Sequence, residues 1–408
     1  MPEIQPFPGV LYRVPDGELP KVLCPPYDVI SASYRDALYA RDPRNAVRLV
    51  LNRTEGDAGY TEAGETYRRF RAEGILAPDP VPALYLLEQQ FDLEGRTLRR
   101  TGLLARFRAE DYGGSVLPHE HTRAAAREDR FRVLQATRAN FSPIFLMFPD
   151  AGGRFARAAA ETTSRVPDLT CVDDGGIGHR LWRVADERSQ SAFGSVLGAA
   201  RAYIADGHHR YATALRHRDL VGPDGAWTFG YFTPMEDPGL VVLPYHRILS
   251  KGPSLAEARK ALERWFLVND AKGPAAAAAQ AAQSTMPYAF ALAEPGRGAL
   301  VAEALPEAED LLPADAPPSL RALDTFFLHQ GVLPRVLDVP EDAVSYVHSL
   351  AEAEEAVAAA RCRLAALMRA TPVRQIVDVA EARQSMPAKS TFFHPKLPSG
   401  LVIHPLLA

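Results

Sequence analysis

Hydrophobic and polar positions alternate in patterns that predict both strands and helices in the first 250 residues. Residues 83–108 contain two strand-like runs on either side of Glu94-Gly95, a pair suited to a tight hairpin turn. The apolar run at 143–148 predicts a buried strand, and apolar residues within 127–139 recur at helical spacing. We therefore expect a mixed α/β fold, in which helices pack against mixed sheets.

A second region with its own helices and strands begins near residue 250. Its amphipathic start, SLAEARKALERWF, predicts a helix, and the Ala/Gln run at 274–283 predicts either a helix or a solvated linker. Two strand-like runs surround Gly296, and the Ala-rich stretch 350–370 predicts one long helix. We therefore expect two domains: residues 1–250 as a catalytic domain, and residues 251–408 as an α/β region whose tail returns to the active site.

The most distinctive local pattern is Asp206-Gly207-His208-His209-Arg210, which lies between a strand-like run and a helical run. A helix N-terminus favours an anion because it presents unpaired N–H groups and the positive end of the helix dipole. Gly207 lets the backbone approach a ligand, and the guanidinium of Arg210 can hold phosphate oxygens. The two histidines can donate to phosphate, carry a proton or bind a metal, and Asp206 can act as a base or contact Mg²⁺. The structural alternative is that Asp206 caps the helix and one histidine is simply packed.

A second polar cluster, Pro118-His119-Glu120-His121, follows a Gly-Gly loop and precedes a predicted helix. In an extended backbone, His119 and His121 point to one side and Glu120 to the other. These residues can supply half of a metal site, completed by the 206–210 turn, or they can cap the following helix. Their spacing matches none of the strong zinc motifs, so transient Mg²⁺ binding or proton transfer fits better than a fixed zinc ion.

The tail segment KSTFFHPK, residues 389–396, combines two cations, two hydroxyls and two aromatic rings. Such a set can bind the phosphates and the base of a nucleotide, although it lacks the glycine-rich loop of a P-loop. The residues assigned to phosphate binding are Lys389, Ser390, Thr391 and Lys396. A solvated, partly packed tail is the competing interpretation.

Composition, charge and the absence of common motifs exclude several broad classes of protein. With 46 basic and 50 acidic residues the formal net charge is −4, which gives no general attraction for nucleic acid or anionic membranes. The start of the chain has no signal-like pattern and no run of about 18 apolar residues occurs, so we expect a cytoplasmic protein without a membrane span. The three cysteines are too far apart for a disulfide framework, and GxSxG, GxGxxG, HExxH and CxxC motifs are absent. The oligomeric state is left open, with a homodimer among the options.

Six stretches of the sequence together resemble the domain of unknown function 1015 family. They follow one another in the same order over nearly the whole chain, and the family name implies no activity. The stretches are CPPYDVIS (24–31), VLPHEHT (116–122), EDRFRVLQATRANFSPIF (128–145), IADGHHRYATAL (204–215), DPGLVVLPYHRIL (237–249) and MPAKSTFFHPKLPSGLVI (386–403).

The 206–210 turn also resembles the phosphate-binding turn of the ParB/sulfiredoxin-like superfamily, which includes partition proteins that use nucleotides, sulfiredoxin and free-serine kinases. In sulfiredoxin a cysteine precedes His-Arg, whereas His208 stands there in this chain, so the resemblance does not imply sulfinic-acid repair. It implies that the helix N-terminus and Arg210 handle phosphate. The free-serine kinases imply serine or phosphoserine as the small-molecule partner.

Together these features predict a nucleotide-dependent phosphotransferase acting on a small hydroxyl metabolite, with serine or phosphoserine favoured and ATP or ADP and Mg²⁺ as cofactors. Two alternatives use the same residues: a metal-dependent phosphoesterase, and a non-catalytic nucleotide-binding or DNA-associated module like the partition proteins. The acidic charge balance disfavours the DNA-associated version. In the favoured hypothesis the base is Asp206 or Glu120, the groups that bind phosphate or metal are His119, His121, His208 and His209, and the charge-neutralising cations are Arg210, Lys389 and Lys396.

Overall fold

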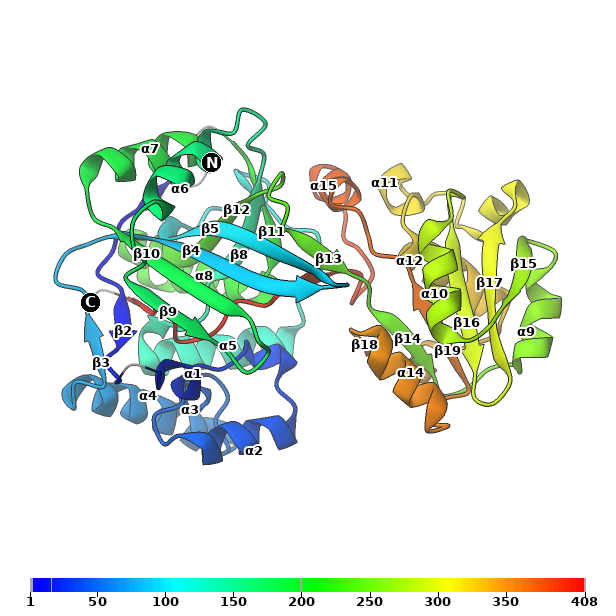
Figure 1. The fold of residues 1–408 in the computed structure, drawn as a ribbon, viewed down its shortest axis with the longest axis horizontal. Helices are drawn as coiled ribbons and strands as arrows, with labels where there is room; N and C mark the ends of the chain where they lie inside the picture. Colours follow the sequence, from blue (N-terminus) through cyan, green and yellow to red (C-terminus); the bar gives the residue numbers. More distant parts are fainter. Residues whose placement is uncertain (1–2, 16, 199, 407–408) are drawn as a thin grey trace. The chain divides into compact units, whose positions relative to one another are not determined.

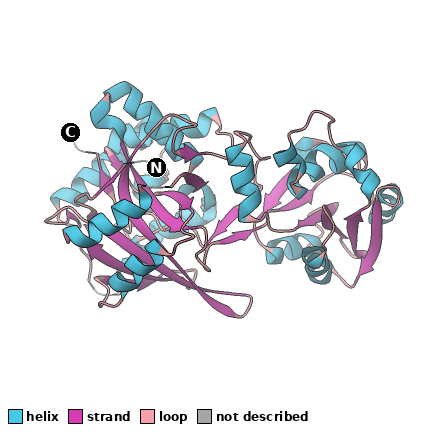
Figure 2. Ribbon diagram, turned by 90° about the horizontal axis from the view of Figure 1, so that it is seen from above, coloured by secondary structure: helices cyan, strands magenta, loops and turns pink. Residues whose placement is uncertain are grey.

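The computed structural model describes residues 3–15, 17–198 and 200–406, and these residues form two compact units. The first unit consists of the described residues within Met1–Pro118, Thr122–Val241 and Pro395–Ala408, and the second of His119–His121 and Val242–His394. Both units combine helices and sheets, which confirms the expected mixed α/β class (Figures 1 and 2). The chain thus passes into the second unit at Val242, ahead of residue 250, and returns to the first at Pro395.

A mixed sheet forms the centre of the first unit. Its strands follow the order β6-β11-β8-β12-β5-β4-β10-β9, and β1 pairs with β5. Two pairs are parallel, β6 with β11 and β8 with β12, whereas the other pairs are antiparallel. The strands are β1 (Ile4–Gln5), β4 (Leu84–Leu93), β5 (Arg96–Arg108), β6 (Val116–Leu117), β8 (Ile144–Phe148), β9 (Leu169–Val172), β10 (Gly178–Val184), β11 (Ala202–Asp206) and β12 (Trp227–Pro234).

Helices α6, α7 and α8 cover one face of this sheet. Side chains from α6 such as Phe155, from α7 such as Phe193 and from α8 such as Tyr211 share one buried cluster with Leu84 and Leu86 of β4, which alternate along the strand as one face requires. The remaining elements of this unit are α1 (Leu19–Val22), η1 (Tyr27–Val29), α2 (Ala32–Arg41), α3 (Val47–Val50), α4 (Gly56–Ala72), α5 (Ala124–Thr137), α6 (Arg154–Thr163), α7 (Glu187–Leu197), α8 (His208–Val221), η2 (Pro223–Ala226), β2 (Val10–Tyr12), β3 (Leu76–Pro78), β7 (Ala139–Asn140) and β21 (His404–Pro405).

Two local expectations in the first unit are confirmed. Residues 83–108 form the β4–β5 hairpin, and both Glu94 and Gly95 adopt positive φ, as a tight hairpin turn with right-handed twist requires. The 206–210 pattern forms a strand, a turn and a helix, because β11 ends at Asp206 and α8 begins at His208. The turn therefore places its polar side chains at one end of the central sheet.

The second unit contains an antiparallel sheet with the strand order β15-β17-β16-β19-β14-β18. Helices α10 and α14 cover one face through small side chains such as Ala277 and Ala353, and α9 packs on the other face through Leu262. The elements are β13 (Val241–Leu243), β14 (His246–Leu249), α9 (Leu255–Leu262), β15 (Phe266–Ala271), α10 (Pro274–Gln283), β16 (Ala289–Glu294), β17 (Gly298–Ala304), η3 (Pro306–Leu311), α11 (Pro318–Arg321), α12 (Asp324–Phe327), η4 (Leu328–Val332), α13 (Leu333–Arg335), η5 (Glu341–Ala343), β18 (Val344–Val347), α14 (Leu350–Ala358), β19 (Leu364–Met368), α15 (Val373–Glu381) and β20 (Phe392–His394).

The expected long helix over 350–370 is wrong. Helix α14 ends at Ala358, Ala360 adopts φ +51°, and the chain then forms β19 between β16 and β14. All five residues of β19, Leu364–Met368, are buried. A strand covered on both faces needs an apolar side chain at every position, so burial outweighs the helix propensity of alanine here.

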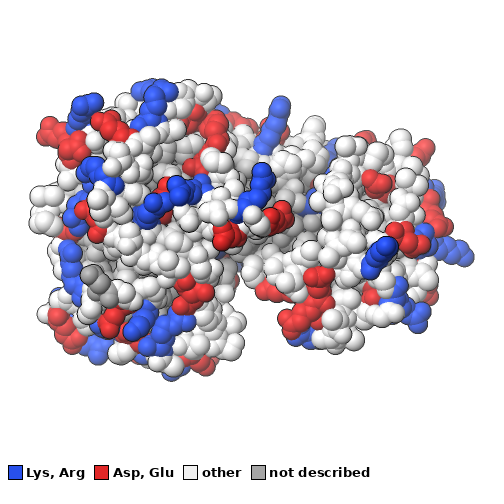
Figure 3. Space-filling view, viewed as in Figure 1, with Lys and Arg blue, Asp and Glu red and all other residues white. Residues whose placement is uncertain are grey.

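None of the helices in the described ranges has the length and apolar character that a membrane crossing requires. On the face drawn in Figure 3, basic and acidic side chains are interspersed over both units.

Candidate functional site

Asp206, at the end of β11, forms ion pairs with two cations in the first unit. Its Oδ1 accepts a hydrogen bond from Lys396 Nζ at 2.5 Å, and its Oδ2 accepts one from Arg210 Nη2 at 2.5 Å. Arg210 also donates to the carbonyl oxygen of Pro143. The three charged side chains are 12 to 17% exposed, so solvent reaches the cluster. One carboxylate and two cations leave one net positive charge at the beginning of α8.

Gly207 makes this arrangement sterically feasible. It is the N-cap of α8 and adopts φ +97°, a conformation that favours glycine. A Cβ atom at this position would lie 2.9 Å from Cζ of Arg210, so any larger residue would push the guanidinium away from the turn. Because glycine has no side chain, the cap position also offers no acceptor of its own to the helix N–H groups, which favours an external anion.

The electrostatics of the cluster keep Asp206 ionised. Burial alone would raise its pKa, but Lys396, Arg210 and His208 outweigh burial and hold the pKa well below its usual range. A carboxylate with such a low pKa is a weak proton acceptor. Its geometry suits it to hold the two cations in place rather than to remove a proton.

A buried polar clamp delivers Lys396 to this turn. Gln89 of β4 and Arg100 of β5 are cross-strand neighbours, and both are fully buried. Arg100 Nη2 donates to the carbonyl oxygen of Pro395 at 2.5 Å, and Gln89 Nε2 donates to that of Lys396 at 3.2 Å. Arg100 also donates to Oε1 of Gln89 and lies 4.6 Å from the ring centre of Phe145. Sequence reasoning missed this clamp.

A small pocket with both apolar and polar walls adjoins Arg210 within the first unit. Its volume is about 50 Å³, enough for a small anion or a few waters but not for a nucleotide. Arg130 lines it with its guanidinium 3.9 Å from the ring centre of Tyr27, and burial raises the pKa of Tyr27 to about 12, although the charge of Arg130 opposes the shift. Thr213 also lines it, and its buried hydroxyl has no hydrogen-bond partner within the described residues. These residues lie in stretches that carried the family resemblance but were given no role.

The two histidines of the turn differ in their surroundings. His208 is 4% exposed. His209 Nε2 accepts a hydrogen bond from the backbone N–H of Arg123 at 3.0 Å, which ties α8 to the start of α5. Burial lowers the pKa of His209; Asp28 opposes this effect, and Arg123 adds to it. His209 is therefore a neutral acceptor in a structural contact, as one of the two histidines was expected to be.

The His119–His121 segment belongs to the second unit. His119 is 1% exposed, its carbonyl oxygen accepts a hydrogen bond from Met386 N–H at 2.8 Å, and its Nε2 lies 3.5 Å from the hydroxyl of Thr391. Glu120 and His121 instead line one cavity. The two histidines therefore have different surroundings, and His121 shares its cavity with Glu120, which pairs with Met386 through a parallel β-bridge.

The tail segment is divided between the units. In the second unit, Lys389 Nζ lies 3.4 Å from the hydroxyl of Tyr245, and Ser390 Oγ donates to the carbonyl oxygen of Pro387 at 2.7 Å. In the first unit, Lys396 pairs with Asp206. The structure thus brings Lys396 to the 206–210 turn and Thr391 to His119, while the turn and the His119–His121 segment belong to different units.

The fold and this turn define an α/β protein with a cation-rich helix N-terminus. The chain belongs to the family described as protein of unknown function (DUF1015), whose profile matches residues 4–326. This match confirms the family that the sequence resembles. No curated protein matches the chain in sequence.

Several solved structures are distantly similar to the chain. A free serine kinase in complex with AMP is 14% identical, with 68% of this chain and 83% of that chain covered and a TM-score of 0.33. A conserved hypothetical protein from Pyrococcus furiosus is 12% identical, with coverage of 70% and 90% and a TM-score of 0.34. SbnI with a C-terminal truncation from Staphylococcus aureus is 10% identical, with coverage of 74% and 87% and a TM-score of 0.37.

Proposed function

We propose that the chain is a nucleotide-dependent phosphotransferase that acts on a small hydroxyl metabolite, with serine or phosphoserine as the favoured partner. The observation that carries this proposal is the cluster of Asp206, Arg210 and Lys396 at the N-terminus of α8. A net positive charge, a guanidinium fork and the positive end of a helix dipole meet there, and each of them favours a phosphoryl group. The likeness of the turn to that of the free-serine kinases favours serine.

The residues fit the phosphate part of ATP or ADP. Besides the two cations, the unpartnered hydroxyl of Thr213 in the pocket beside Arg210 is a donor that a phosphate oxygen would satisfy. When bound, the nucleotide supplies or accepts the phosphoryl group. The fit to Mg²⁺ is poor, because both oxygens of Asp206 pair with cations and the described part of the chain has no group of three His, Cys, Asp or Glu side chains that could hold a metal ion.

In this proposal the chain's own residues supply position and charge. Arg210 and Lys396 bind oxygen atoms of the phosphoryl group and offset the negative charge of those oxygen atoms. Asp206 holds both cations in position. Phosphoryl transfer passes through a loose transition state, so oriented cations contribute more than a strong base. Glu120, the other residue considered as a base, lies in the second unit, and a role for it in transfer remains a prediction.

Product analysis by ³¹P NMR tests the proposal. The full chain is incubated with ATP and serine, and separately with ADP and phosphoserine, with and without added Mg²⁺. We expect a phosphorylated acceptor that is lost in Lys396→Met and retained in Lys21→Met, a matched control at an exposed lysine of the first unit. Thermal unfolding of each variant separates loss of activity from loss of fold.

Two results would redirect the proposal, and a third would overturn it. Release of inorganic phosphate without a phosphorylated acceptor indicates a phosphoesterase. Binding of nucleotide without turnover of either acceptor indicates a non-catalytic module. Full activity in folded Lys396→Met would show that the cluster does not handle phosphate.

A further inference from the structure

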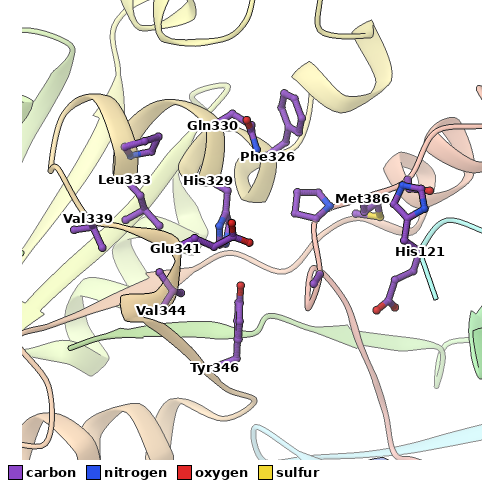
Figure 4. A pocket seen from close by; sticks show the side chains of 15 residues that line it. His121, Phe326, His329, Gln330, Leu333, Val339, Glu341, Val344, Tyr346 and Met386 are labelled. Carbon is purple, nitrogen blue, oxygen red and sulfur yellow. The ribbon is translucent and has the colours of Figure 1, made fainter. Parts of the chain in front are cut away.

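A second site lies entirely within the second unit and contains none of the three charged residues Asp206, Arg210 and Lys396. It is a cavity of about 580 Å³, a size typical of small-molecule sites. Its walls come from the His119–His121 segment, from η4 and α13, from β18 and from residues 385–388. Figure 4 shows the side chains of His329, Glu341 and Tyr346 around the same space. We refer to it as the His329 cavity.

The protonation of His329 is fixed by a buried arginine. Arg247 Nε donates a hydrogen bond to His329 Nε2 at 3.1 Å. Because Nε2 accepts this hydrogen bond, the ring proton must sit on Nδ1, which has no hydrogen-bond partner within the described residues. Burial, and then the charge of Arg247, lower the pKa of His329 to about 4, so the ring is neutral near pH 7. His329 therefore has one oriented N–H donor that the protein leaves unused.

Arg247 gives this donor a positive environment. The side chain is fully buried, and burial lowers its pKa to about 10 although Tyr346 opposes the shift, so it stays charged at neutral pH. Its other hydrogen bonds go to the carbonyl oxygens of Tyr245 at 2.5 Å and Lys389 at 3.3 Å. No carboxylate within the described residues forms an ion pair with it. A buried cation without a counter-charge favours a nearby anion strongly, because the surrounding dielectric constant is low.

The backbone at this place is irregular in a way that is common at binding sites. Leu328–Val332 forms a π-helical turn between α12 and α13, and it carries both His329 and Gln330 of the cavity wall. Such wide turns are rare and often mark functional sites. Gly331 lets the turn pack closely, because a Cβ atom there would lie 3.1 Å from Cβ of Leu311. The turn thus aims His329 away from the helix core.

The remaining wall limits the class of ligand. Phe326, Leu333 and Met386 provide apolar surface, and the charged side chains on the wall are the carboxylates Glu120 and Glu341. The described lining has no lysine or arginine, so the second negative charge of a phosphate would have no cation to offset it. The single charge of a carboxylate is offset by Arg247, which lies directly behind His329, and an apolar body suits the apolar part of the wall.

We propose that the His329 cavity binds a small monocarboxylate with an apolar body, whose carboxylate accepts a hydrogen bond from Nδ1 of His329. The apolar body packs against Phe326, Leu333 and Met386. No covalent step is involved.

Binding of three matched probes to the full chain tests this proposal by calorimetry. Phenylacetate has the proposed chemistry, phenylacetamide replaces its charge by a neutral amide, and phenyl phosphate carries a larger negative charge. We expect phenylacetate to bind about tenfold or more tightly than either of the others. His329→Leu should weaken phenylacetate binding by a similar factor, whereas His348→Leu, at an exposed histidine of the same unit outside the cavity, should not.

Two further measurements make the test independent of any one variant. Long-range ¹H–¹⁵N spectra of the wild-type protein should show His329 as the neutral form protonated at Nδ1. Asp206→Asn, which alters only the site in the first unit, should bind phenylacetate as the wild type does. Equal binding of phenylacetate and phenylacetamide, no binding of phenylacetate, or unchanged binding in folded His329→Leu would each overturn the proposal.

Discussion

The two units each bury one arginine completely, and the two arginines have different surroundings. In the first unit, burial lowers the pKa of Arg100, and Tyr231, Asp237 and Asp206 oppose that shift. In the second unit, burial lowers the pKa of Arg247, and Tyr346 opposes that shift. Carboxylates thus influence the pKa of Arg100, whereas a tyrosine opposes the shift at Arg247.

This difference shows two uses of a buried guanidinium. Arg100 binds the backbone of the tail and so places Lys396 beside Asp206, which makes it a positioning residue for a cluster of largely buried charges. Arg247 binds a histidine and so fixes which ring nitrogen carries the proton. Arg210 and Lys396 thus face a carboxylate, whereas Arg247 faces carbonyl oxygens, an aromatic ring and an imidazole. Variants that remove single cations can break or sharpen this contrast.

The largest effect is expected at Arg210. Arg210→Ala removes a guanidinium that would offset charge in the transition state, and we expect turnover in the phosphotransfer assay to fall about 10³-fold. Arg188→Ala, at an arginine of the first unit whose side chain is 87% exposed, should leave turnover unchanged. Steady-state rates from ³¹P NMR or a coupled assay provide the measurement. Unchanged turnover in folded Arg210→Ala would remove the contrast, because the cations of the first unit would then have no catalytic use.

The next largest effect is expected on stability. Arg100→Met leaves the carbonyl oxygen of Pro395 and Oε1 of Gln89 without their donor, and we expect the free energy of unfolding to fall by about 3 kcal/mol. Arg247→Met also leaves acceptors without a donor, but it removes a buried charge that has no counter-charge. We therefore expect a smaller loss in the free energy of unfolding for Arg247→Met than for Arg100→Met. Urea unfolding followed by circular dichroism compares the two. A larger loss for Arg247→Met would mean that its charge is better compensated than its contacts indicate.

An intermediate effect is expected from acid. Burial, and then Arg247, lower the pKa of His329 to about 4, below its usual value of about 6.5. The unfolded chain therefore takes up a proton below about pH 6.5 that the folded chain does not bind until about pH 4, so stability falls as the pH falls through this window. His329→Gln cannot titrate and should lose about 1–2 kcal/mol less than the wild type between pH 7 and pH 5.

Urea unfolding at the two pH values measures this difference. His348→Gln serves as a control for the replacement of a histidine elsewhere in the same unit. An identical pH dependence in His329→Gln would show that His329 is protonated as readily in the folded state as in the unfolded state. It would also remove the neutral donor from the His329 cavity.

The sequence predicts those parts of the molecule that depend on neighbouring residues. The β4–β5 hairpin follows from Glu94-Gly95, and the β11–α8 turn follows from an apolar strand that ends in Asp-Gly. The helix expected across 350–370 is wrong because alanine's propensity is a local signal, whereas the burial of β19 between two strands is not. Propensity gives no information about which strands will flank a segment.

The site shows the same limit. The anion-favouring turn can be recognised from five consecutive residues, but Lys396 reaches Asp206 from 190 residues away through backbone contacts with a buried clamp. One signal for the clamp exists: Arg99 and Arg100 are adjacent in a strand, so one of them must face inward. The pairing of Arg247 with His329 has no such signal, because Arg247 lies in the stretch 237–249 and His329 lies in none of the six stretches.

The smallest effect on stability is expected at Lys389, one of the two lysines of the tail segment. Lys396 pairs with a carboxylate, whereas Lys389 lies 5.0 Å from the ring centre of Tyr245 and 3.4 Å from its hydroxyl. Lys389→Met keeps the aliphatic stem and loses a partly exposed cation–ring contact, so we expect it to lower the free energy of unfolding by only about 0.5–1 kcal/mol. Lys396→Met leaves Asp206 with one cation instead of two and should cost more. Urea unfolding of both variants under one set of conditions compares the two losses in the free energy of unfolding. Equal losses would show that a partly buried lysine contributes as much to stability beside an aromatic ring as beside a carboxylate in this fold.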